Sequence, residues 1–363
     1  MTTNRLYLTW SAELRKMFPA LHKPQWRNLA WLLVGIYLSR SVHLSRIAAH
    51  IPGPATLVSL TRRLSRYLED ARWQVRDLYE PTIRPLLEHL AQSGRLRLII
   101  DCSAVSFHHQ LLMVSLAYRK RAIPLAWTWV RCHRGHSATH VQLALLAYVR
   151  RLLPDTVSVE LVGDCEFGAI DVLRQVEAWG WRFALRQKPN HQIKTDADPA
   201  WQPFAALAPR PGASCWVSDA RLTARHQFAT HLLAYWARGE DEPWLIATNM
   251  PDALTARKAY AHRMWIEELF GDLKGHGFDL ESTHLNCILK LTRLTFAVVL
   301  LYVWLVALGS QVIRRGLRHE VDRSDRRDLS IFQIGLRFIQ RCLTNSRPIR
   351  ITFRCVIPKL SGG

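Results

Sequence analysis

The chain reads Leu96-Arg-Leu-Ile-Ile100 and then Asp101 at the point where a helical pattern gives way to short runs of β-type residues. Two more such runs follow closely, at residues 111–118 and 124–130. Short apolar runs with short connections are typical of an antiparallel meander. We therefore expect three neighbouring strands here, with an aspartate at the end of the first.

The next part of the sequence alternates between helix and strand patterns. Helical patterns at 139–153 and 169–179 are interleaved with β-type runs at 157–162 and 182–186. Residues 190–250 break the alternation with Pro, Asp and Trp, and we interpret them as a β-rich insertion. The order βββ-α-β-α-β predicts an α/β fold with a mixed sheet.

Helical patterns dominate both ends of the chain. Residues 24–90 carry apolar residues at three- and four-residue spacing. Within them, 43–50 and 60–68 flank a Pro-Gly turn, as in a helix-turn-helix, although an ordinary helical bundle explains them equally well. Residues 294–313 are uncharged and about as long as a membrane span, but a single late apolar segment favours a buried core helix.

Charge is concentrated at the ends of the chain. The 363 residues carry a formal net charge of +20, of which residues 1–97 contribute +9 and residues 285–363 contribute +10. A phosphate-binding protein is expected to segregate charge in this way, although a basic surface kept for solubility would do so too. Seven cysteines without a C-x-x-C motif favour a reducing compartment, and no signal-peptide pattern follows Met1.

These patterns predict three parts. Residues 1–94 form an all-α domain, residues 95–284 form the α/β core with its insertion at about 190–250, and residues 285–363 form a core helix and a basic C-terminal region. Asp101 and Asp164 each follow a predicted strand of the core, where side chains project into the crevice that binds ligands.

A third acid, Glu267, lies in a strong helical pattern over 253–274. In a continuous helix, Tyr260, Arg263, Glu267 and Lys274 fall within an arc of about 60° on one face. The alternative is an ordinary Arg–Glu ion pair on a solvent-exposed helix face. Such a pair would not explain why a tyrosine and a lysine lie on the same face of the helix. Three carboxylates on a basic protein suit two Mg²⁺ ions that clamp the attacking and leaving oxygens of a phosphodiester.

The Y-x2-R-x3-E-x6-K spacing of these four residues resembles the signature of the IS-four family of bacterial insertion-sequence transposases. Asp101 in Leu98-Ile-Ile-Asp-Cys-Ser-Ala and Asp164 in Leu161-Val-Gly-Asp-Cys-Glu-Phe match the other two acids of that family. The resemblance implies a DDE transposase on a ribonuclease H-like fold. It further implies that Asp101, Asp164 and Glu267 are the catalytic acids, which bind Mg²⁺ or, in its place, Mn²⁺.

The resemblance also implies how DNA is handled. Tyr260, Arg263 and Lys274 would contact the terminal phosphates, and Trp244 would stack on a base flipped out of the duplex. The enzyme would bind terminal inverted repeats, pair two ends in a homodimeric synaptic complex, cut both strands through a hairpin and join target DNA. It would be a cytoplasmic, nucleoid-associated bacterial protein that needs no membrane.

Two other functions are compatible with the sequence. One is a metal-dependent nuclease that cuts without joining, although a minimal nuclease would not need the insertion between Asp164 and Glu267. The other is a non-catalytic DNA-binding descendant of a transposase, which the intact set of acids disfavours.

Overall fold

The structure, a computed structural model, describes residues 2–106, 108–131 and 137–357. The chain divides into two compact units. Gly94–Glu268 forms one, referred to below as the sheet unit, and Met1–Ser93 together with Leu269–Gly363 forms the other, the helical unit. The helices before residue 94 thus share a unit with the helices near the C-terminus.

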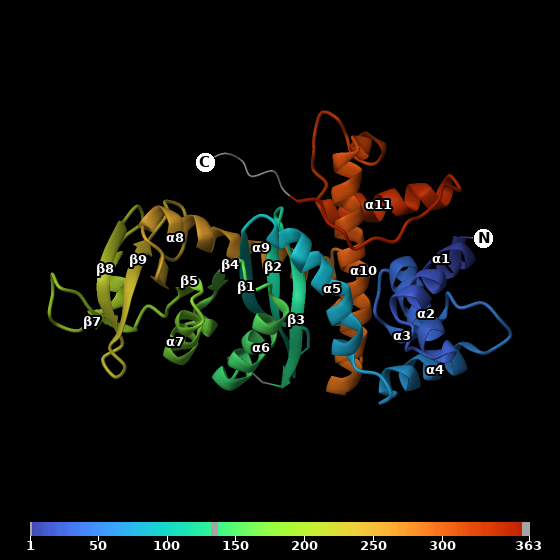
Figure 1. The fold of residues 1–363 in the computed structure, drawn as a ribbon, viewed down its shortest axis with the longest axis horizontal. Helices are drawn as coiled ribbons and strands as arrows, with labels where there is room; N and C mark the ends of the chain where they lie inside the picture. Colours follow the sequence, from blue (N-terminus) through green and yellow to red (C-terminus); the bar gives the residue numbers. More distant parts are fainter. Residues whose placement is uncertain (1, 107, 132–136, 358–363) are drawn as a thin grey trace. The chain divides into compact units, whose positions relative to one another are not determined.

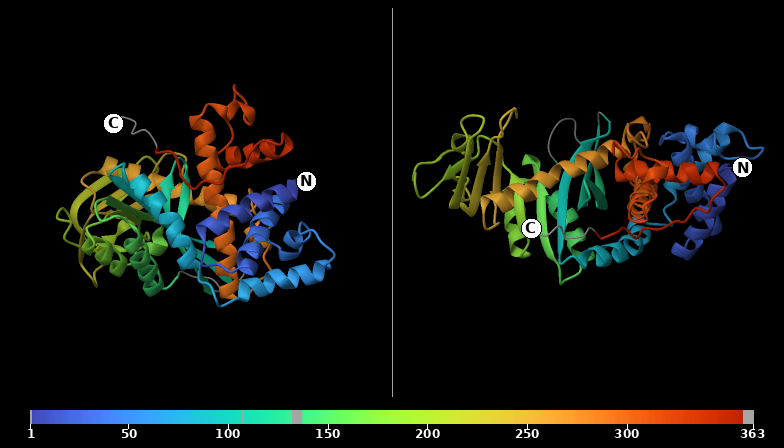
Figure 2. Two further views of the ribbon diagram at one scale, coloured as in Figure 1. Left: turned by 45° about the vertical axis from the view of Figure 1, so that its right-hand side comes forward. Right: turned by 90° about the horizontal axis from the view of Figure 1, so that it is seen from above.

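In its described part, the sheet unit contains one mixed sheet of ten strands in the order β3-β2-β1-β4-β5-β10-β9-β8-β6-β7. Figures 1 and 2 show these strands in the green and yellow part of the chain. The strands are β1 (Arg95–Ala104), β2 (His109–Tyr118), β3 (Arg121–Arg131), β4 (Ser158–Gly163), β5 (Arg182–Arg186), β6 (Gln192–Lys194), β7 (Gln202–Pro203), β8 (Ser214–Leu222), β9 (Phe228–Tyr235) and β10 (Trp244–Thr248).

Strand directions confirm the predicted meander and mixed sheet. β1, β2 and β3 are antiparallel neighbours, whereas β4 runs parallel to β1 and β5 parallel to β4. β10 then pairs antiparallel with both β5 and β9. The β-type residues between 190 and 250 therefore extend the edge of the same sheet beyond β5.

Three helices of the sheet unit pack against these strands. α6 (Thr139–Leu152) contacts β2 and β3, and α7 (Ile170–Ala178) contacts β5 and α6. α8 (Ala253–Tyr260) contacts β4, β5 and β9. Burial follows helical spacing, as in the row Leu145, Val149 and Leu152 of α6, because one face of each helix covers the sheet.

The prediction of one continuous helix over 253–274 is wrong. α8 ends at Tyr260, a 3₁₀ turn occupies Ala261–Arg263, and α9 covers Met264–Leu273. A 3₁₀ turn within a helical run often marks a functional hinge or a strained sequence. This turn contains His262, whose side chain is hydrogen-bonded to the sheet, as described below.

The helical unit confirms the helical patterns predicted at both ends of the chain. Its helices are α1 (Thr2–Met17), α2 (Lys23–Ser39), α3 (Leu44–Ala48), α4 (Leu57–Glu69), α5 (Val75–Ala91), α10 (Ile288–Arg314) and α11 (Ile331–Thr344). Short 3₁₀ turns complete the two units at Cys165–Phe167, Phe204–Leu207, Leu280–Ser282 and Leu317–Glu320.

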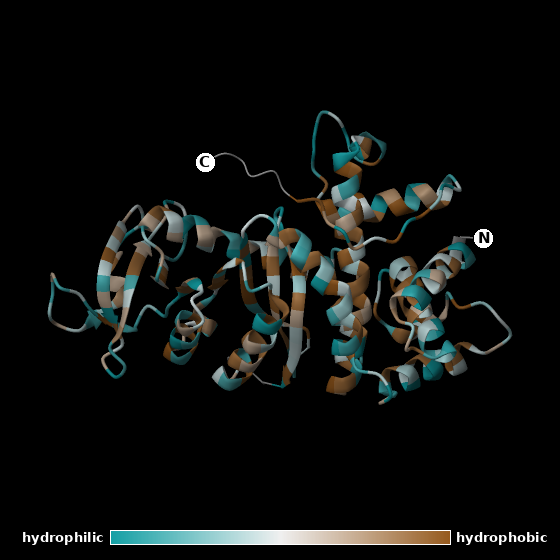
Figure 3. Cartoon of the chain, in the orientation of Figure 1, coloured by the Kyte–Doolittle hydropathy of each residue, from teal (hydrophilic) through white to brown (hydrophobic). Residues whose placement is uncertain are grey.

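α10 is the central helix of the helical unit. It contacts α2, α4, α5 and α11, and its apolar turns are brown in Figure 3. It is long and apolar enough to cross a membrane, but 89% of its most apolar window is buried inside the protein, which agrees with the predicted core helix. α11 crosses it closely, because a Cβ on Gly335 would lie 2.0 Å from the carbonyl oxygen of Leu305.

Candidate active site

Two of the predicted acids follow neighbouring positions of two parallel strands. Ile100 of β1 lies opposite Gly163 of β4, so the next residue is Asp101 on one strand and Asp164 on the other. A Cβ on Gly163 would lie 2.8 Å from Cγ2 of Ile100, so glycine lets the strands approach closely here. β1 continues to Ala104 beside β2, so Asp101 lies within its strand and not at its end as predicted.

Arg263 connects Asp101 to the third predicted acid, Glu267. Its Nη1 donates to Oδ2 of Asp101 at 3.1 Å, and its Nη2 donates to Oε1 of Glu267 at 2.5 Å. The Arg263 side chain is only 12% exposed, so solvent screens these charge-assisted hydrogen bonds weakly. In this structure the guanidinium predicted to contact a DNA phosphate is therefore bound to two of the acids.

The Asp101 carboxyl group is electrostatically perturbed. Burial raises its pKa to about 7, against the lowering effects of Arg263 and of the Cys102 backbone N–H, which donates to Oδ1 at 2.8 Å. The nearby charges of Asp164 and Glu267 raise the pKa further. Shifts of this kind, with a specific charged partner, are typical of functional sites.

Asp164 has an acceptor that the protein leaves unused. Its Oδ1 is buried and accepts no hydrogen bond from the described residues. Nη1 of Arg186 lies 3.8 Å from this oxygen, while Nη2 of the same guanidinium is 2.8 Å from the Glu242 carboxylate. An unsatisfied buried carboxylate oxygen is costly, and a bound cation would satisfy it.

His262 anchors the 3₁₀ turn to the sheet. Arg97 donates from Nη1 to Nε2 of His262 at 2.9 Å, so Nδ1 carries the proton and donates to the Lys258 carbonyl at 2.7 Å. Burial and the Arg97 charge lower the pKa of His262, which favours this neutral form. The Arg97 guanidinium also donates from Nε to buried Glu160 at 2.8 Å.

This anchor explains how the turn reaches the acids. Arg97 and Asp101 are four residues apart on β1 and face the same side of the sheet. His262 and Arg263, which are consecutive residues of the 3₁₀ turn, therefore contact the same side of the sheet through Arg97 and Asp101. Sequence reasoning missed this cluster, for which the available signal was a charged residue inside each of two apolar strand patterns, Arg97 and Glu160.

The two predicted aromatic DNA contacts lie against each other. The rings of Trp244 and Tyr260 are 5.0 Å apart in an edge-to-face arrangement, and the ring of Tyr235 is 5.9 Å from that of Trp244. Tyr260 is 2% exposed, and its burial raises its pKa, so its hydroxyl stays protonated. Trp244, at the start of β10, is half-buried and retains some accessible surface.

Lys274 lies just beyond the end of α9. Its Nζ forms an ion pair of 2.9 Å with Glu281. The break at residues 261–263 means that Lys274 is not on one uninterrupted helix with Tyr260, as the predicted arc assumed. Its predicted role as a phosphate contact stays a prediction.

A divalent cation fits the chemistry of the acids, although the acids are not grouped around one here. Among the described residues, no three His, Cys, Asp or Glu side chains are grouped closely enough to hold a metal ion. Carboxylate oxygens are the ligands that Mg²⁺ prefers, and Asp164 offers an unused one. Arg263 already supplies positive charge between Asp101 and Glu267, so a metal ion would compete with its guanidinium.

Residues 96–304 match the sequence model of a family described as Transposase DDE domain. The match covers more than half of the chain. The chain belongs to this family. The matched part includes Asp101, Asp164 and Glu267, and the family consists of enzymes that cleave DNA, transfer strands and use divalent metal ions.

The chain is similar to a solved structure of the piggyBac transposase synaptic complex with hairpin DNA, at 10% identity and a TM-score of 0.45. That likeness covers 95% of this chain and 77% of the other. No curated protein matches the sequence.

Proposed function

We propose that this DDE transposase is a cut-and-paste enzyme of the IS-four family, which binds the terminal inverted repeats of an insertion sequence. It cleaves the element ends through a hairpin and joins them to target DNA. The observation that carries the proposal is the position of the acids: Asp101 and Asp164 directly follow the paired residues Ile100 and Gly163 of two parallel strands, and Glu267 is joined to Asp101 through Arg263. The Y-x2-R-x3-E-x6-K spacing supports the choice of family.

The fold proposed for the core is ribonuclease H-like. Three antiparallel strands followed by two parallel ones, in the order β3-β2-β1-β4-β5, support it. The strands from β6 to β10 are then the insertion between the second and third acids. Residues 1–94 are proposed as the DNA-binding domain, in which α4 carries exposed Arg62 and Arg66 without a carboxylate partner among the described residues.

Asp101, Asp164 and Glu267 are the residues proposed to hold Mg²⁺, or Mn²⁺ in its place. Bound metal would polarise the scissile phosphate and favour deprotonation of the attacking water or 3′-hydroxyl. Asp101 must lose its proton to act as a ligand, and its pKa of about 7 makes that inexpensive at neutral pH.

The remaining signature residues are proposed to bind DNA. Arg263, once released from the acids, pairs with a phosphate next to the scissile bond, and Lys274 and Tyr260 hold the terminal phosphates. Trp244 provides its half-buried ring as the stacking surface for a flipped base. Two copies of the chain would pair two ends in a synaptic homodimer, in the bacterial cytoplasm and without a membrane.

Cleavage of DNA that carries the element ends tests the proposal. Glu267→Ala should abolish the Mg²⁺-dependent cut, because it removes a metal ligand, while binding of the same DNA stays largely intact. Glu268→Ala is a matched control, because Glu268 pairs with Arg121 at 2.7 Å and not with the acids. Products are resolved on a denaturing gel, where a hairpin has a distinct mobility.

The outcomes separate the three functions. A hairpin at the element end, absent in Glu267→Ala, supports the proposed transposase. Cuts that are never followed by joining to target DNA indicate the nuclease. Binding without any cut in Mg²⁺ or Mn²⁺ indicates the non-catalytic descendant.

A further inference from the structure

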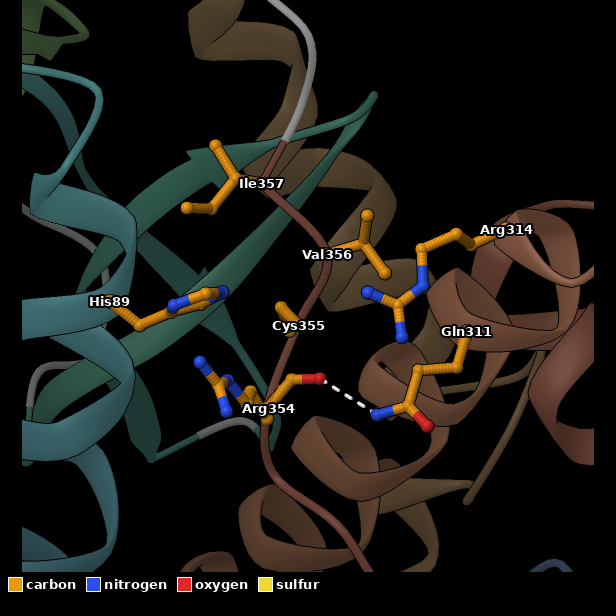
Figure 4. Close-up of a pocket in the computed structure, with 7 residues that line it drawn as sticks. All are labelled: His89, Gln311, Arg314, Arg354, Cys355, Val356 and Ile357. Carbon is orange, nitrogen blue, oxygen red and sulfur yellow. Dashed lines mark hydrogen bonds between the residues drawn. The ribbon is translucent and has the colours of Figure 1, made fainter.

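A cavity of about 400 Å³ lies wholly in the helical unit, between α5, the end of α10 and the C-terminal segment, defined here as residues 347–357. Figure 4 shows its lining, which consists of His89, Gln311, Arg314, Arg354, Cys355, Val356 and Ile357. Two guanidinium groups and an imidazole line this cavity, and none of its described lining residues is acidic. Its composition suits an anion.

The two arginines of this cavity have no carboxylate partner in the part of the chain that the structure describes. Arg314 and Arg354 are exposed, and neither forms an ion pair with a carboxylate of the described residues. Other arginines of the same region are paired with acids: Arg318 with Asp322, Arg323 with Asp325, Arg326 with Asp328 and Arg347 with Glu320. Arg314 and Arg354 thus belong to the arginines of this region whose charge no carboxylate of the described residues neutralises.

The wall of the cavity is held in place by hydrogen bonds. Nε2 of Gln311 donates to the carbonyl oxygen of Arg354 at 2.9 Å, a bond drawn in Figure 4. The N–H of Val356 donates to Ser310 at 3.1 Å, and Cys355 is 1% exposed. Fixing the backbone of the C-terminal segment in this way lowers the ordering cost of binding a ligand there.

A second cavity on the same segment repeats the pattern. It has a volume of about 320 Å³, shares Gln311, and is lined by Arg315 and Arg350, which likewise have no carboxylate partner among the described residues. A third cavity shares His89 and Arg354 but also contains Glu88, which makes it less suited to an anion. Two cavities along the C-terminal segment are thus each lined by two arginines that have no carboxylate partner among the described residues.

We propose that the cavity with Arg314 and Arg354 binds a phosphate group of the DNA backbone, and that the C-terminal segment is a DNA-binding element. Guanidinium groups bind phosphate oxygens with good geometry, and their exposure lets a duplex reach them, as an enclosed small-molecule site would not. This inference rests on DNA as the substrate of the proposed function, but not on metal binding, hairpin formation or strand joining.

Salt dependence of duplex binding tests the proposal. The double variant Arg314→Gln with Arg354→Gln should reduce the slope of log K against log salt concentration by about 0.9, the contribution of the one phosphate contact that the variant loses. Arg323→Gln with Arg326→Gln removes the same charge from arginines paired with aspartates, and should leave the slope nearly unchanged. The double variant Arg314→Lys with Arg354→Lys should restore most of the slope that the glutamine variant loses.

Binding is measured with EDTA present, so that failure of cleavage and failure of this site stay distinguishable, and thermal melting confirms that each variant is folded. An unchanged slope in the glutamine variant, or an equal change in the control pair, would overturn the proposal. Isothermal titration with inorganic phosphate forms the second arm. Phosphate binding that the glutamine variant loses, together with an unchanged DNA slope, would assign the cavity to a free phosphate ion instead.

Discussion

The arginines beside the acids of the sheet unit and those at the cavity of the helical unit differ in their pairing. In the sheet unit, Arg97, Arg186 and Arg263 each bind a carboxylate at or beside the acids. In the helical unit, Arg314 and Arg354 have no carboxylate partner among the described residues. A paired guanidinium has to be released before it can bind a phosphate, whereas an unpaired one binds at once. We therefore expect DNA to bind first through the helical unit, and the arginine at the acids to change partner later.

The largest effect should come from Asp164, the acid with the unused oxygen. Asp164→Asn removes a proposed metal ligand and should lower the rate of DNA-end cleavage by about 10³-fold or more, with DNA affinity unchanged. Asp171→Asn is the control, because Asp171 is exposed and lies 3.9 Å from Arg174. Single-turnover cleavage measures both variants, and a residual rate within tenfold of the wild type would exclude Asp164 from the catalytic set.

A substitution of Arg263 tests whether its ion pairs with Asp101 and Glu267 compete with metal binding. Without DNA, Arg263→Gln should raise the affinity for Mn²⁺ by about tenfold, because a positive charge leaves a poorly screened site. The same variant should cleave DNA poorly, since the proposed phosphate contact is lost. Arg257→Gln controls for charge alone, because Arg257 stacks on the ring of Tyr235 at 4.9 Å.

Titration calorimetry or Mn²⁺ paramagnetic resonance gives the affinities. A weaker affinity in Arg263→Gln would mean that this arginine supports the metal site and does not compete for it.

Much of the fold was predictable, because it follows from local pattern. Apolar runs predicted β1 to β5, and the uncharged run at 294–313 predicted the core of α10. The 3₁₀ turn was not predictable from the local helical pattern, and the contact between Arg97 and His262 that accompanies it joins residues far apart in sequence. Spacing and resemblance selected the three acids, but no local pattern shows that the Arg263 guanidinium binds two of them.

Metal affinity should depend on pH through Asp101. Its pKa of about 7 lies above the ordinary value of 3.8, so the metal-free folded protein holds an extra proton between these values and loses stability as the pH rises through this window. Below pH 7 a metal ion must displace that proton. Affinity for Mn²⁺ should therefore rise by up to about tenfold per pH unit toward neutrality and level off above it.

Proton release on Mn²⁺ addition, measured in a weakly buffered solution, checks this directly. Arg263→Gln should move the midpoint to higher pH, since the arginine lowers the pKa of Asp101. A pH-independent affinity between pH 5 and 7 would show that Asp101 is ionised before metal binds.

The smallest effect should come from Glu242, which shares Arg186 with Asp164. Glu242 is 74% exposed, so its ion pair contributes little to stability. Glu242→Gln should leave Arg186 nearer to Asp164 and weaken Mn²⁺ binding by about two- to fivefold, within the range of an exposed pair. Glu240→Gln, in the same exposed loop, should leave the Mn²⁺ affinity unchanged. An equal loss of affinity in both variants would show that Arg186 does not transmit the effect to Asp164.

The 3₁₀ turn at Ala261–Arg263 sets the rotational phase between α8 and α9. Each added residue rotates the chain by about 100° in an α-helix and about 120° in a 3₁₀ turn. A substitution that leaves the turn intact keeps that phase, whereas one inserted or deleted residue rotates Glu267 about a third of a circle away from Asp101. The number of residues between the signature positions therefore sets the direction in which Glu267 faces.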